Sequence, residues 1–412
     1  MSLIKPFPGL RPVAGREDDV VAPPYDVMNR AEAKSMAAGR PWSFLHISRP
    51  EIDLPDETDP YDPTVYAKGR ENLDHMVAEG VLAQDASACY YAYRLTMGEH
   101  VQTGIVAGAS VQAYDNDRIK KHEFTRPVKE DDRVRQVDAL NAQTGPVFLV
   151  YRANEVVDGI LADVACQAPD MDVTAADGVR HEIWVIDAPQ TVQRLSDAFE
   201  AMDALYVADG HHRSAAGSRV GASRAKANPE HTGDESYNYF LSVIFPHDQM
   251  QILDYNRVVR DLKGLSPEAF LEQVGQRFQV EASPEPVRPD GESCFGMYLA
   301  GQWYRLVLKE EFASDDPVKG LDVSLLADNL IEPVLGISDP RRDTRIDFVG
   351  GIRGLGELEK RVDGGDWAVA FALYPTSMEA LMRVADAGEV MPPKSTWFEP
   401  KLADGLVSHV LD

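Results

Sequence analysis

The segment Leu205–Arg213, with the sequence Leu-Tyr-Val-Ala-Asp-Gly-His-His-Arg, holds the densest group of reactive side chains in the chain. Its apolar first half predicts a strand, and the small residues after it predict a helix. A strand-to-helix turn presents free backbone N–H groups and the positive end of a helix dipole, which together suit an anion. The segment therefore predicts an oxyanion site at positions 209–213.

The residue types in this turn fit that chemistry. Gly210 permits close approach of the backbone, and Arg213 offers a planar fork for phosphate or carboxylate. Asp209 with His211 or His212 can bind a divalent cation or move a proton. The alternative is an aspartate that caps a helix and is followed by exposed histidines. The place of the segment at the end of a strand, with an arginine, favours the site.

A second cluster runs from Arg118 to Arg135 and contains seven Lys or Arg and four Asp or Glu, a local charge of +3 in a chain of net charge −26. Such a basic island would attract a highly charged anion such as a nucleotide polyphosphate, and Lys120 and Lys121 are its candidate contacts. Glu123, beside His122 and at the end of a β run, is the candidate general base. For residues 127–135, an exposed helix face with i,i+4 ion pairs is an equal alternative.

A third segment, Met391–Lys401, holds two prolines followed by Lys394, Ser395 and Thr396. The prolines keep the chain extended, and the next three residues offer one cation and two hydroxyls, as in a phosphate-contacting loop. No Gly-x-x-x-x-Gly precedes the lysine, so the loop is not of the Walker A type. The alternative is a proline-rich strand that covers the core.

Two glycine- or proline-containing segments are weaker candidates. Val21–Asp26 can line a cleft through Tyr25 and Asp26, although rigid loop packing explains it as well. Gly350–Gly356 lacks the Gly-x-Gly-x-x-Gly spacing of a dinucleotide site and predicts a tight turn. The sequence contains no zincin, α/β-hydrolase or protein kinase signature.

Helix and strand patterns alternate along the chain and predict an α/β (α+β) protein with a mixed sheet. Helices are expected at 31–38, 63–79, 127–143 and 191–202, and a hairpin at 88–97 and 101–114. Further strands are expected at 146–151, 182–186, 204–208 and 237–245. The polar stretch Lys226–Glu235 is the best linker, so the predicted domains are residues 1–230 and a C-terminal α/β lobe of residues 236–412.

Composition excludes several functional classes. The chain has 412 residues, 44% of them hydrophobic, and 26 more acidic than basic residues, which disfavours binding to nucleic acid or anionic lipid. No apolar run approaches the ~20 residues of a membrane helix, and the N-terminus lacks a signal-peptide pattern. Three separated cysteines indicate neither a disulfide framework nor a metal site. We therefore expect a cytoplasmic protein whose partners are small molecules, with a homodimer left open.

Four motifs in this order resemble the domain-of-unknown-function 1015 family: Ala22–Val27, His122-Glu123 with Asp132-Arg133, Ala208–Arg213, and Met391–Thr396. The resemblance covers nearly the whole chain. The Asp-Gly-His-His-Arg segment also resembles the phosphate-binding turn of ParB/sulfiredoxin-like proteins, a group that includes free serine kinases.

The resemblance implies nucleotide-dependent phosphoryl transfer to a small hydroxyl compound such as free L-serine, with ATP or ADP and Mg²⁺. Asp209, His211, His212 and Arg213 would hold the phosphates, and Glu123 would be the base, although 85 residues separate Glu123 from Asp209 here. The full hypothesis assigns a catalytic role to Glu123, His122 and Asp209. It assigns nucleotide binding to Gly210, His211, His212, Arg213, Lys120, Lys121, Lys394, Ser395 and Thr396. It assigns metal binding to Asp209 and substrate binding to Tyr25, Asp26 and Arg133.

Two other functions use the same residues. A non-catalytic nucleotide-binding regulatory protein would need the phosphate turn but not Glu123. A metal-dependent hydrolase would use Asp209, His211, His212 and His122 to hold a transition metal.

Overall fold

A computed structural model describes residues 2–412 of the chain, which divide into two compact units. The first unit comprises the chain up to Met250 together with Pro400–Asp412, and the second comprises Gln251–Glu399. The chain thus leaves the first unit once and returns to it for its last residues. The polar stretch 226–235, where the sequence suggested a linker, lies inside the first unit.

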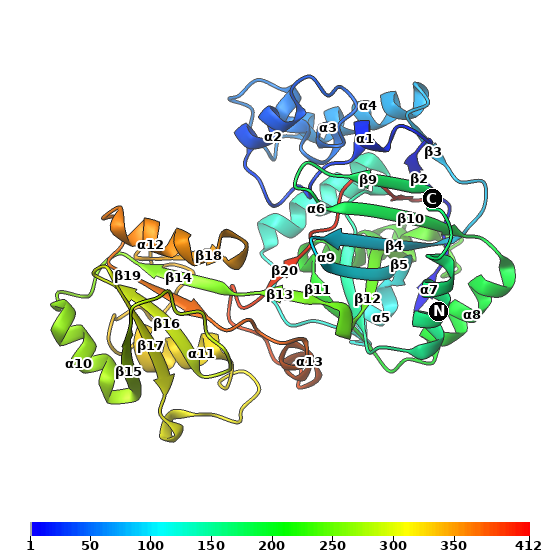
Figure 1. Cartoon of the computed structure of the whole chain (residues 1–412). Coiled ribbons are helices and arrows are strands. Elements are labelled where there is room, and N and C mark those ends of the chain that lie inside the picture. Colours follow the sequence, from blue (N-terminus) through cyan, green and yellow to red (C-terminus); the bar gives the residue numbers. More distant parts are fainter. Residues whose placement is uncertain (1) are drawn as a thin grey trace. The chain divides into compact units, whose positions relative to one another are not determined.

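The first unit is built on a mixed nine-stranded sheet (Figure 1). Parallel pairs join β6 to β11 and β8 to β12, and the other pairs are antiparallel. In spatial order the strands are β6 (Ile119–Lys120), β11 (Leu205–Asp209), β8 (Val147–Tyr151), β12 (Tyr239–Pro246), β5 (His100–Ser110), β4 (Tyr90–Met97), β10 (Arg180–Ile186) and β9 (Met171–Thr174), with β1 (Ile4–Lys5) on β5.

Two groups of helices pack on this sheet. Helices α7 (Glu155–Val164) and α8 (Pro189–Glu200) bury Val157, Leu161 and Phe199 in the main core. Helix α9 (His211–Ala227) packs along α6 (Pro127–Leu140) and beside α5 (Val111–Asp115). Small residues of α9 also allow close packing on β12: a Cβ added to Gly217 would lie 2.9 Å from Phe240.

A smaller layer combines three N-terminal helices with a second sheet. A second apolar cluster joins α2 (Arg30–Ala37), α3 (Leu45–Ser48) and α4 (Pro63–Ala78). A four-stranded antiparallel sheet beside it contains β3 (Leu82–Gln84), β2 (Gly9–Pro12), β21 (Ser408–Val410) and β7 (Ala142–Gln143). Strand β21 lies between β2 and β7, so the C-terminal segment is part of the fold of the first unit.

The second unit is a six-stranded antiparallel sheet with helices (Figure 1). Its strands in order are β15 (Phe278–Ser283), β17 (Gln302–Leu308), β16 (Cys294–Leu299), β19 (Val369–Leu373), β14 (Tyr255–Val259) and β18 (Ile346–Gly350). Its longer helices are α10 (Pro267–Arg277), α12 (Leu355–Asp363) and α13 (Met378–Asp386), and β13 (Gln251–Leu253) pairs with β20 (Trp397–Glu399). The predicted α/β lobe is thus an antiparallel α+β unit.

Most predicted elements are confirmed within one to four residues. The expected helix at 31–38 is α2, and Asn29 forms a full capping box with Glu32. The predicted strand at 101–114 was wrong at its end, because Val111–Asp115 forms α5. The Ser110 hydroxyl accepts a hydrogen bond from the Ala113 amide at 3.1 Å and so caps this short helix.

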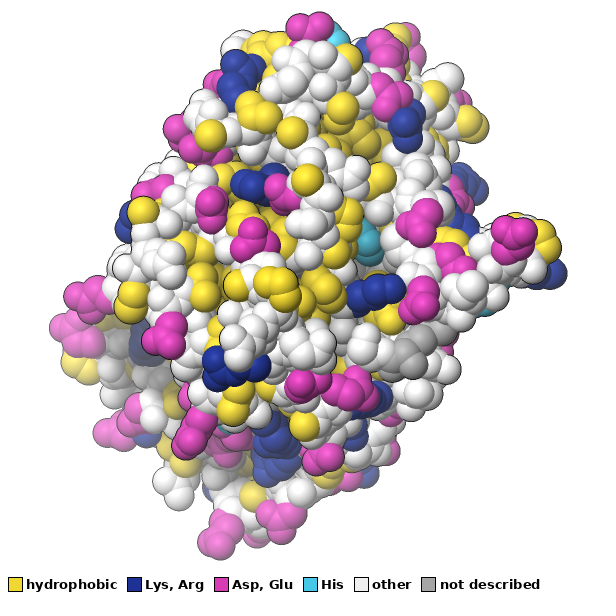
Figure 2. Space-filling model, turned by 90° about the vertical axis from the view of Figure 1, so that its right-hand side faces the viewer, with side chains coloured by type: hydrophobic (Ala, Val, Ile, Leu, Met, Phe, Trp, Pro, Cys, Tyr) yellow, Lys and Arg dark blue, Asp and Glu magenta, His cyan; other side chains and the backbone are white. Residues whose placement is uncertain are grey.

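In the described part of the chain, no helix is both long and apolar enough to span a membrane. On the face shown in Figure 2, Lys and Arg side chains are interspersed with Asp and Glu. That face therefore presents no continuous basic surface of the kind that nucleic acid requires.

Candidate functional site

The turn between β11 and α9 is built by Gly210. This residue has φ of +94°, a left-handed conformation that costs other residues roughly 1–2 kcal/mol. A Cβ here would also lie 3.1 Å from Nε of Arg213. Because the residue before the helix is glycine, no side chain caps the first-turn amides of α9. The N-terminus of a 17-residue helix is left able to bind an anion.

Asp209 occupies the end of β11, where it faces two cations. Its Oδ1 accepts a hydrogen bond from the Gly210 amide at 2.8 Å, and its Oδ2 lies 3.3 Å from Nζ of Lys401. Burial alone would raise the pKa of Asp209, but Lys401 and Arg213 hold this pKa well below its usual range. Asp209 is therefore an ionised group that positions the turn and Lys401.

This arrangement does not fit the predicted metal role of Asp209, since its two oxygens already face an amide and an ammonium group. Among residues 2–412, no group of three or more His, Cys, Asp or Glu side chains is arranged to hold a metal ion. The alternative of a metal-dependent hydrolase consequently has no ligand set in the described chain.

Two buried histidines stand next to the turn. The rings of His122 and His211 meet edge to face, with centroids 4.5 Å apart. Burial lowers the pKa of His122 to about 4, and burial with the neighbouring His122 lowers the pKa of His211 well below its usual value. Both rings are thus neutral near pH 7. Nδ1 of His122 and Nε2 of His211 are buried without a hydrogen-bond partner, and such nitrogens suit a polar ligand.

Glu123 lies beside the same turn despite its distance in sequence. Its Oε2 is 3.8 Å from Nδ1 of His211, and its side chain is 54% exposed. The parallel pairing of β6 with β11 explains the approach, because β6 ends two residues before His122 and β11 ends directly before Gly210. The sheet thus brings the candidate base to the N-terminus of α9.

His212 has a different position from His211. Its Nε2 accepts a hydrogen bond from the Arg126 backbone amide at 3.0 Å. That contact ties the chain before α6 to the first turn of α9 and uses Nε2 of the ring. The predicted contact of His212 with a nucleotide stays a prediction.

Arg213 is nearly buried, with 9% of its side chain exposed. Nη1 donates to the Pro146 carbonyl at 2.5 Å, and Nη2 lies 3.6 Å from the exposed Asp26. Nε is buried and has no partner. A buried guanidinium with an unused N–H is a strong site for an oxyanion.

A pocket with about 460 Å³ of empty space, part of it open to solvent, adjoins Arg213. Its polar lining comes from six different segments of the first unit. The polar residues and one glycine that line it are Tyr25, Ser48, Arg133, Gln136, Gln143, Thr144, Gly145, Arg213 and Asp404.

Asp404 is the most deeply buried acid of this pocket, at 1% exposed. Its backbone pairs with Ala22, which fixes it next to the segment that carries Tyr25. Burial raises the pKa of Asp404 to about 7, although Arg213 opposes the increase. Oδ1 of Asp404 is buried and has no partner.

Arg133 and Tyr25 form one wall of the pocket. The Arg133 guanidinium stacks 3.9 Å from the Tyr25 ring centre, and Asp132 accepts from its Nε and Nη2. Burial raises the pKa of Tyr25, so the phenol stays neutral. Tyr66 donates to the other oxygen of Asp132 at 2.9 Å and fixes its orientation.

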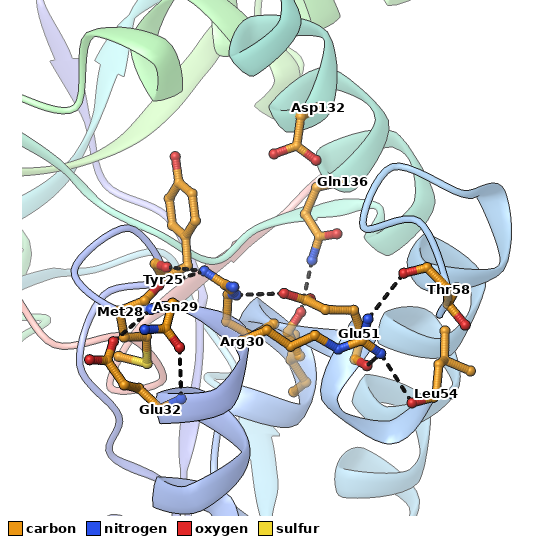
Figure 3. Close-up of polar contacts among 12 residues, drawn as sticks. Tyr25, Met28, Asn29, Arg30, Glu32, Glu51, Leu54, Thr58, Asp132 and Gln136 are labelled. Atoms are coloured by element: carbon orange, nitrogen blue, oxygen red, sulfur yellow. Dashed lines mark hydrogen bonds and ion pairs between the residues drawn. The ribbon is translucent and has the colours of Figure 1, made fainter. Parts of the chain in front are cut away.

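Arginine side chains hold this wall in place from behind (Figure 3). Arg49 donates to the carbonyls of Tyr25 and Met28 and to the Glu51 carboxylate. Arg30 donates to the carbonyls of Glu51, Leu54 and Thr58, among others. In Figure 3 the Tyr25 ring points away from this network toward the helix that carries Asp132 and Gln136. The backbone under Tyr25 is therefore rigidly held.

The basic island is not one anion site. Arg118 pairs with Glu200, and Lys121 donates to the Tyr114 carbonyl and covers the Tyr114 ring. Lys120 lies in β6, next to Tyr206 in the sheet register. The Lys121 ammonium group contacts α5, and its role as an anion contact stays a prediction.

Lys394, Ser395 and Thr396 belong to the second unit. Lys394 has φ of +61° and its ammonium group lies 5.6 Å from the Tyr255 ring centre. The Ser395 hydroxyl donates to the Pro392 carbonyl at 2.6 Å, so it shapes its own loop. Arg257 is buried and donates to the Lys394 carbonyl at 2.9 Å.

Sequence reasoning missed Lys401, Asp404 and Ser48 as site residues. Lys401 is the last residue of the segment Met391–Lys401, and Asp404 lies three residues further on. Gly405, directly after Asp404, has φ of +92° and lies against the Phe44 ring. A lysine and an aspartate shortly before a glycine weakly indicate a turn that carries functional side chains. Ser48 gave no signal, because a lone serine at a helix end is common.

Several solved structures are similar to this chain. A free serine kinase in complex with AMP is 13% identical with a TM-score of 0.37, and the match covers 75% of this chain and 91% of that one. C-terminally truncated SbnI from Staphylococcus aureus is 12% identical with a TM-score of 0.40, covering 74% and 87%. A conserved hypothetical protein from Pyrococcus furiosus is 14% identical with a TM-score of 0.35, covering 76% and 97%.

No curated protein matches the sequence significantly. A family model described as "Protein of unknown function (DUF1015)" matches residues 4–324, more than three quarters of the 412 residues. This match includes three of the four motifs noted in the sequence, and the fourth lies beyond its end. The chain therefore belongs to the DUF1015 family.

Proposed function

We propose that this protein is a nucleotide-dependent phosphotransferase that acts on a small hydroxyl metabolite, with phosphate groups held at the N-terminus of α9. One observation carries the proposal. Around an uncapped helix N-terminus, buried nitrogens of His122, His211 and Arg213 have no hydrogen-bond partner. Unsatisfied buried donors and a helix dipole at one point favour an oxyanion.

Charge also favours phosphate at this place. Arg213 contributes a cation at the turn, and the two histidines are neutral donors or acceptors. Phosphoryl transfer depends mainly on positioning and on neutralising the phosphate oxygens, and both requirements suit a rigid turn with an arginine. The ionised Asp209 keeps Lys401 within 3.3 Å of the same turn.

Glu123 is the proposed base for the acceptor hydroxyl. Its carboxylate is partly exposed, so it can accept a proton, and it lies 3.8 Å from the turn residue His211. A base at this place is within reach of a hydroxyl that attacks a phosphate bound by the α9 amides. His122 is not a base in this proposal, because its ring is buried behind that of His211.

The test is a screen of hydroxyl compounds with ATP and with ADP, following phosphorylated products by mass spectrometry. We expect one hydroxyl compound to gain a phosphate group in the presence of one of these nucleotides. Detection of bound nucleotide that no acceptor consumes would favour the non-catalytic regulatory function instead. Failure of ATP and ADP to bind at all would refute the proposal.

Nucleotide titration of Arg213→Lys gives a second test. Lysine keeps the charge but cannot supply the free Nε–H or the planar fork. Loss of one charge-assisted hydrogen bond of ~1.5–3 kcal/mol predicts a roughly 10- to 150-fold higher Kd for the nucleotide. Arg180→Lys is the matched control, because Arg180 pairs with Asp172 on the far edge of the sheet.

A further inference from the structure

The two most exposed of the large apolar side chains lie beside the turn at Asp209–Arg213. In the part of the chain that the structure describes, Phe124 is 76% exposed and Val128 is 62% exposed, and every other large apolar side chain is less exposed. Single exposed apolar residues are common on protein surfaces. Two of them at the edge of one candidate site indicate a surface that a ligand covers.

The segment that carries Phe124 approaches the turn on both sides of this residue. Oε2 of Glu123 lies 3.8 Å from Nδ1 of His211. The Arg126 amide donates a hydrogen bond to Nε2 of His212 at 3.0 Å. These two histidines are the first residues of α9. Phe124 therefore lies beside the helix N-terminus that holds phosphate groups in the proposed function.

Hydrogen bonds fix this segment to two helices. The Thr125 hydroxyl donates to Oε2 of Glu130 in α6 at 2.7 Å. Oε1 of Glu130 accepts a hydrogen bond from Arg219 in α9 at 2.8 Å. Since Arg126 is bound to α9 as well, the chain next to Phe124 is held in place. The fold itself thus keeps this aromatic ring in solvent.

A nucleotide has a surface that such a ring can bind. Its phosphate groups suit the helix N-terminus, and its base is a flat apolar plate that is joined to them through the ribose. The base must therefore lie beside the phosphate site and not in it. Aromatic side chains stack on bases of every kind, because each base has a π-face. A small hydroxyl acceptor has no comparable surface.

The extent of the apolar surface favours a small ligand over a protein partner. Phe124 and Val128 are interspersed in the sequence with Glu123, Arg126 and Lys129, which are charged and exposed. A stable protein interface buries ~1,200–2,000 Å² around a core that is depleted in charged residues. Two apolar side chains among charged ones make too small a core for such an interface, but they can cover one base.

We propose that the ring of Phe124 stacks on the base of the bound nucleotide, with Val128 at the edge of the same subsite. The subsite rests on the proposed function, because phosphate groups bound at α9 are what bring the base to Phe124. Binding of the base and binding of the phosphate groups then depend on different residues.

Inorganic polyphosphates separate the two parts of the ligand, because they carry the phosphate groups without the nucleoside. The test is calorimetric titration of the full chain with ATP and tripolyphosphate, and with ADP and pyrophosphate. Phe124→Ser should raise the Kd of both nucleotides roughly 5- to 150-fold, which is the effect of losing one stacked aromatic ring. The Kd of both inorganic ligands should stay unchanged.

Further variants separate stacking from general effects. Phe124→Tyr keeps the aromatic face and should bind ATP as the wild type does. Phe124→Leu keeps only an apolar side chain and should bind ATP more weakly. Val101→Ser is the matched control, because Val101 is also exposed but lies in the hairpin of β4 and β5. All of these variants should keep the wild-type Tm, since the replaced side chains are exposed.

The subsite and the proposed function can fail separately. A ratio of the ATP and tripolyphosphate Kd values that is the same in Phe124→Ser and in the wild type would overturn the subsite and keep the proposed phosphotransferase. Weaker binding of tripolyphosphate to Phe124→Ser would also overturn the subsite, because Phe124 would then act on the phosphate groups. A smaller mass of Phe124→Ser in light scattering, with an unchanged ratio, would instead assign Phe124 to a contact between two copies of the chain. Failure of all four ligands to bind the wild type would refute the proposed function, and the subsite with it.

Discussion

Replacing Asp404 with asparagine should stabilise the protein, and the gain should grow with pH. Burial raises the pKa of Asp404 from 3.8 to about 7. Each pKa unit corresponds to about 1.4 kcal/mol, so the ionised carboxyl costs the folded state about 4 kcal/mol. Asparagine has nearly the same shape and never ionises, so the variant avoids this cost.

The sign follows from proton linkage. Below about pH 3, Asp404 is protonated in both the folded and the unfolded chain, and it contributes no penalty. As the pH rises from about 4 to about 7, the unfolded chain releases this proton while the folded chain keeps it, so wild-type stability falls. The advantage of Asp404→Asn should therefore be about 1.5 kcal/mol near pH 5 and about 4 kcal/mol near pH 8.

Urea unfolding followed by hydrogen exchange in peptides from β8 and β11 measures this difference, because both strands belong to the first unit. The buried histidines titrate alike in both proteins, so their contributions cancel. The reasoning would be refuted by a stability difference that is the same near pH 5 and near pH 8.

Three further outcomes are expected. Glu123→Gln should lower turnover by roughly 10²- to 10⁴-fold in steady-state kinetics and leave the nucleotide Kd unchanged in calorimetry. Unaltered turnover would show that Glu123 is not the base. Gly210→Ala should lower the unfolding free energy by about 1–2 kcal/mol and weaken nucleotide binding; neutral behaviour in denaturation would contradict the strained turn. Lys401→Met should raise the pKa of Asp209, so that stability is lost at higher pH on acidification than in the wild type; coincident acid-unfolding curves would show that Lys401 is not its partner.

Local sequence determined much of this protein. Helix α2 was predictable from the Asn29 cap before the helix and the glycine after the helix. Strand β8 was predictable from its unbroken apolar run. Both signals act within a few residues. The turn at Asp209–Arg213 was predictable for the same reason, since a strand, a glycine and a helix follow one another directly. The helix α5 was not predicted, because a β-like composition was overruled by the Ser110 cap and by packing on α9.

Tertiary structure decided the composition of the site. Glu123 meets His211 because two strands far apart in sequence pair side by side, and no local pattern specifies that pairing. Lys121 contacts the Tyr114 carbonyl and ring. Asp404 became an acid with a raised pKa only because the last residues return to the first unit and bury it there. Burial and neighbouring charges set the chemistry of a side chain, and both depend on the completed fold.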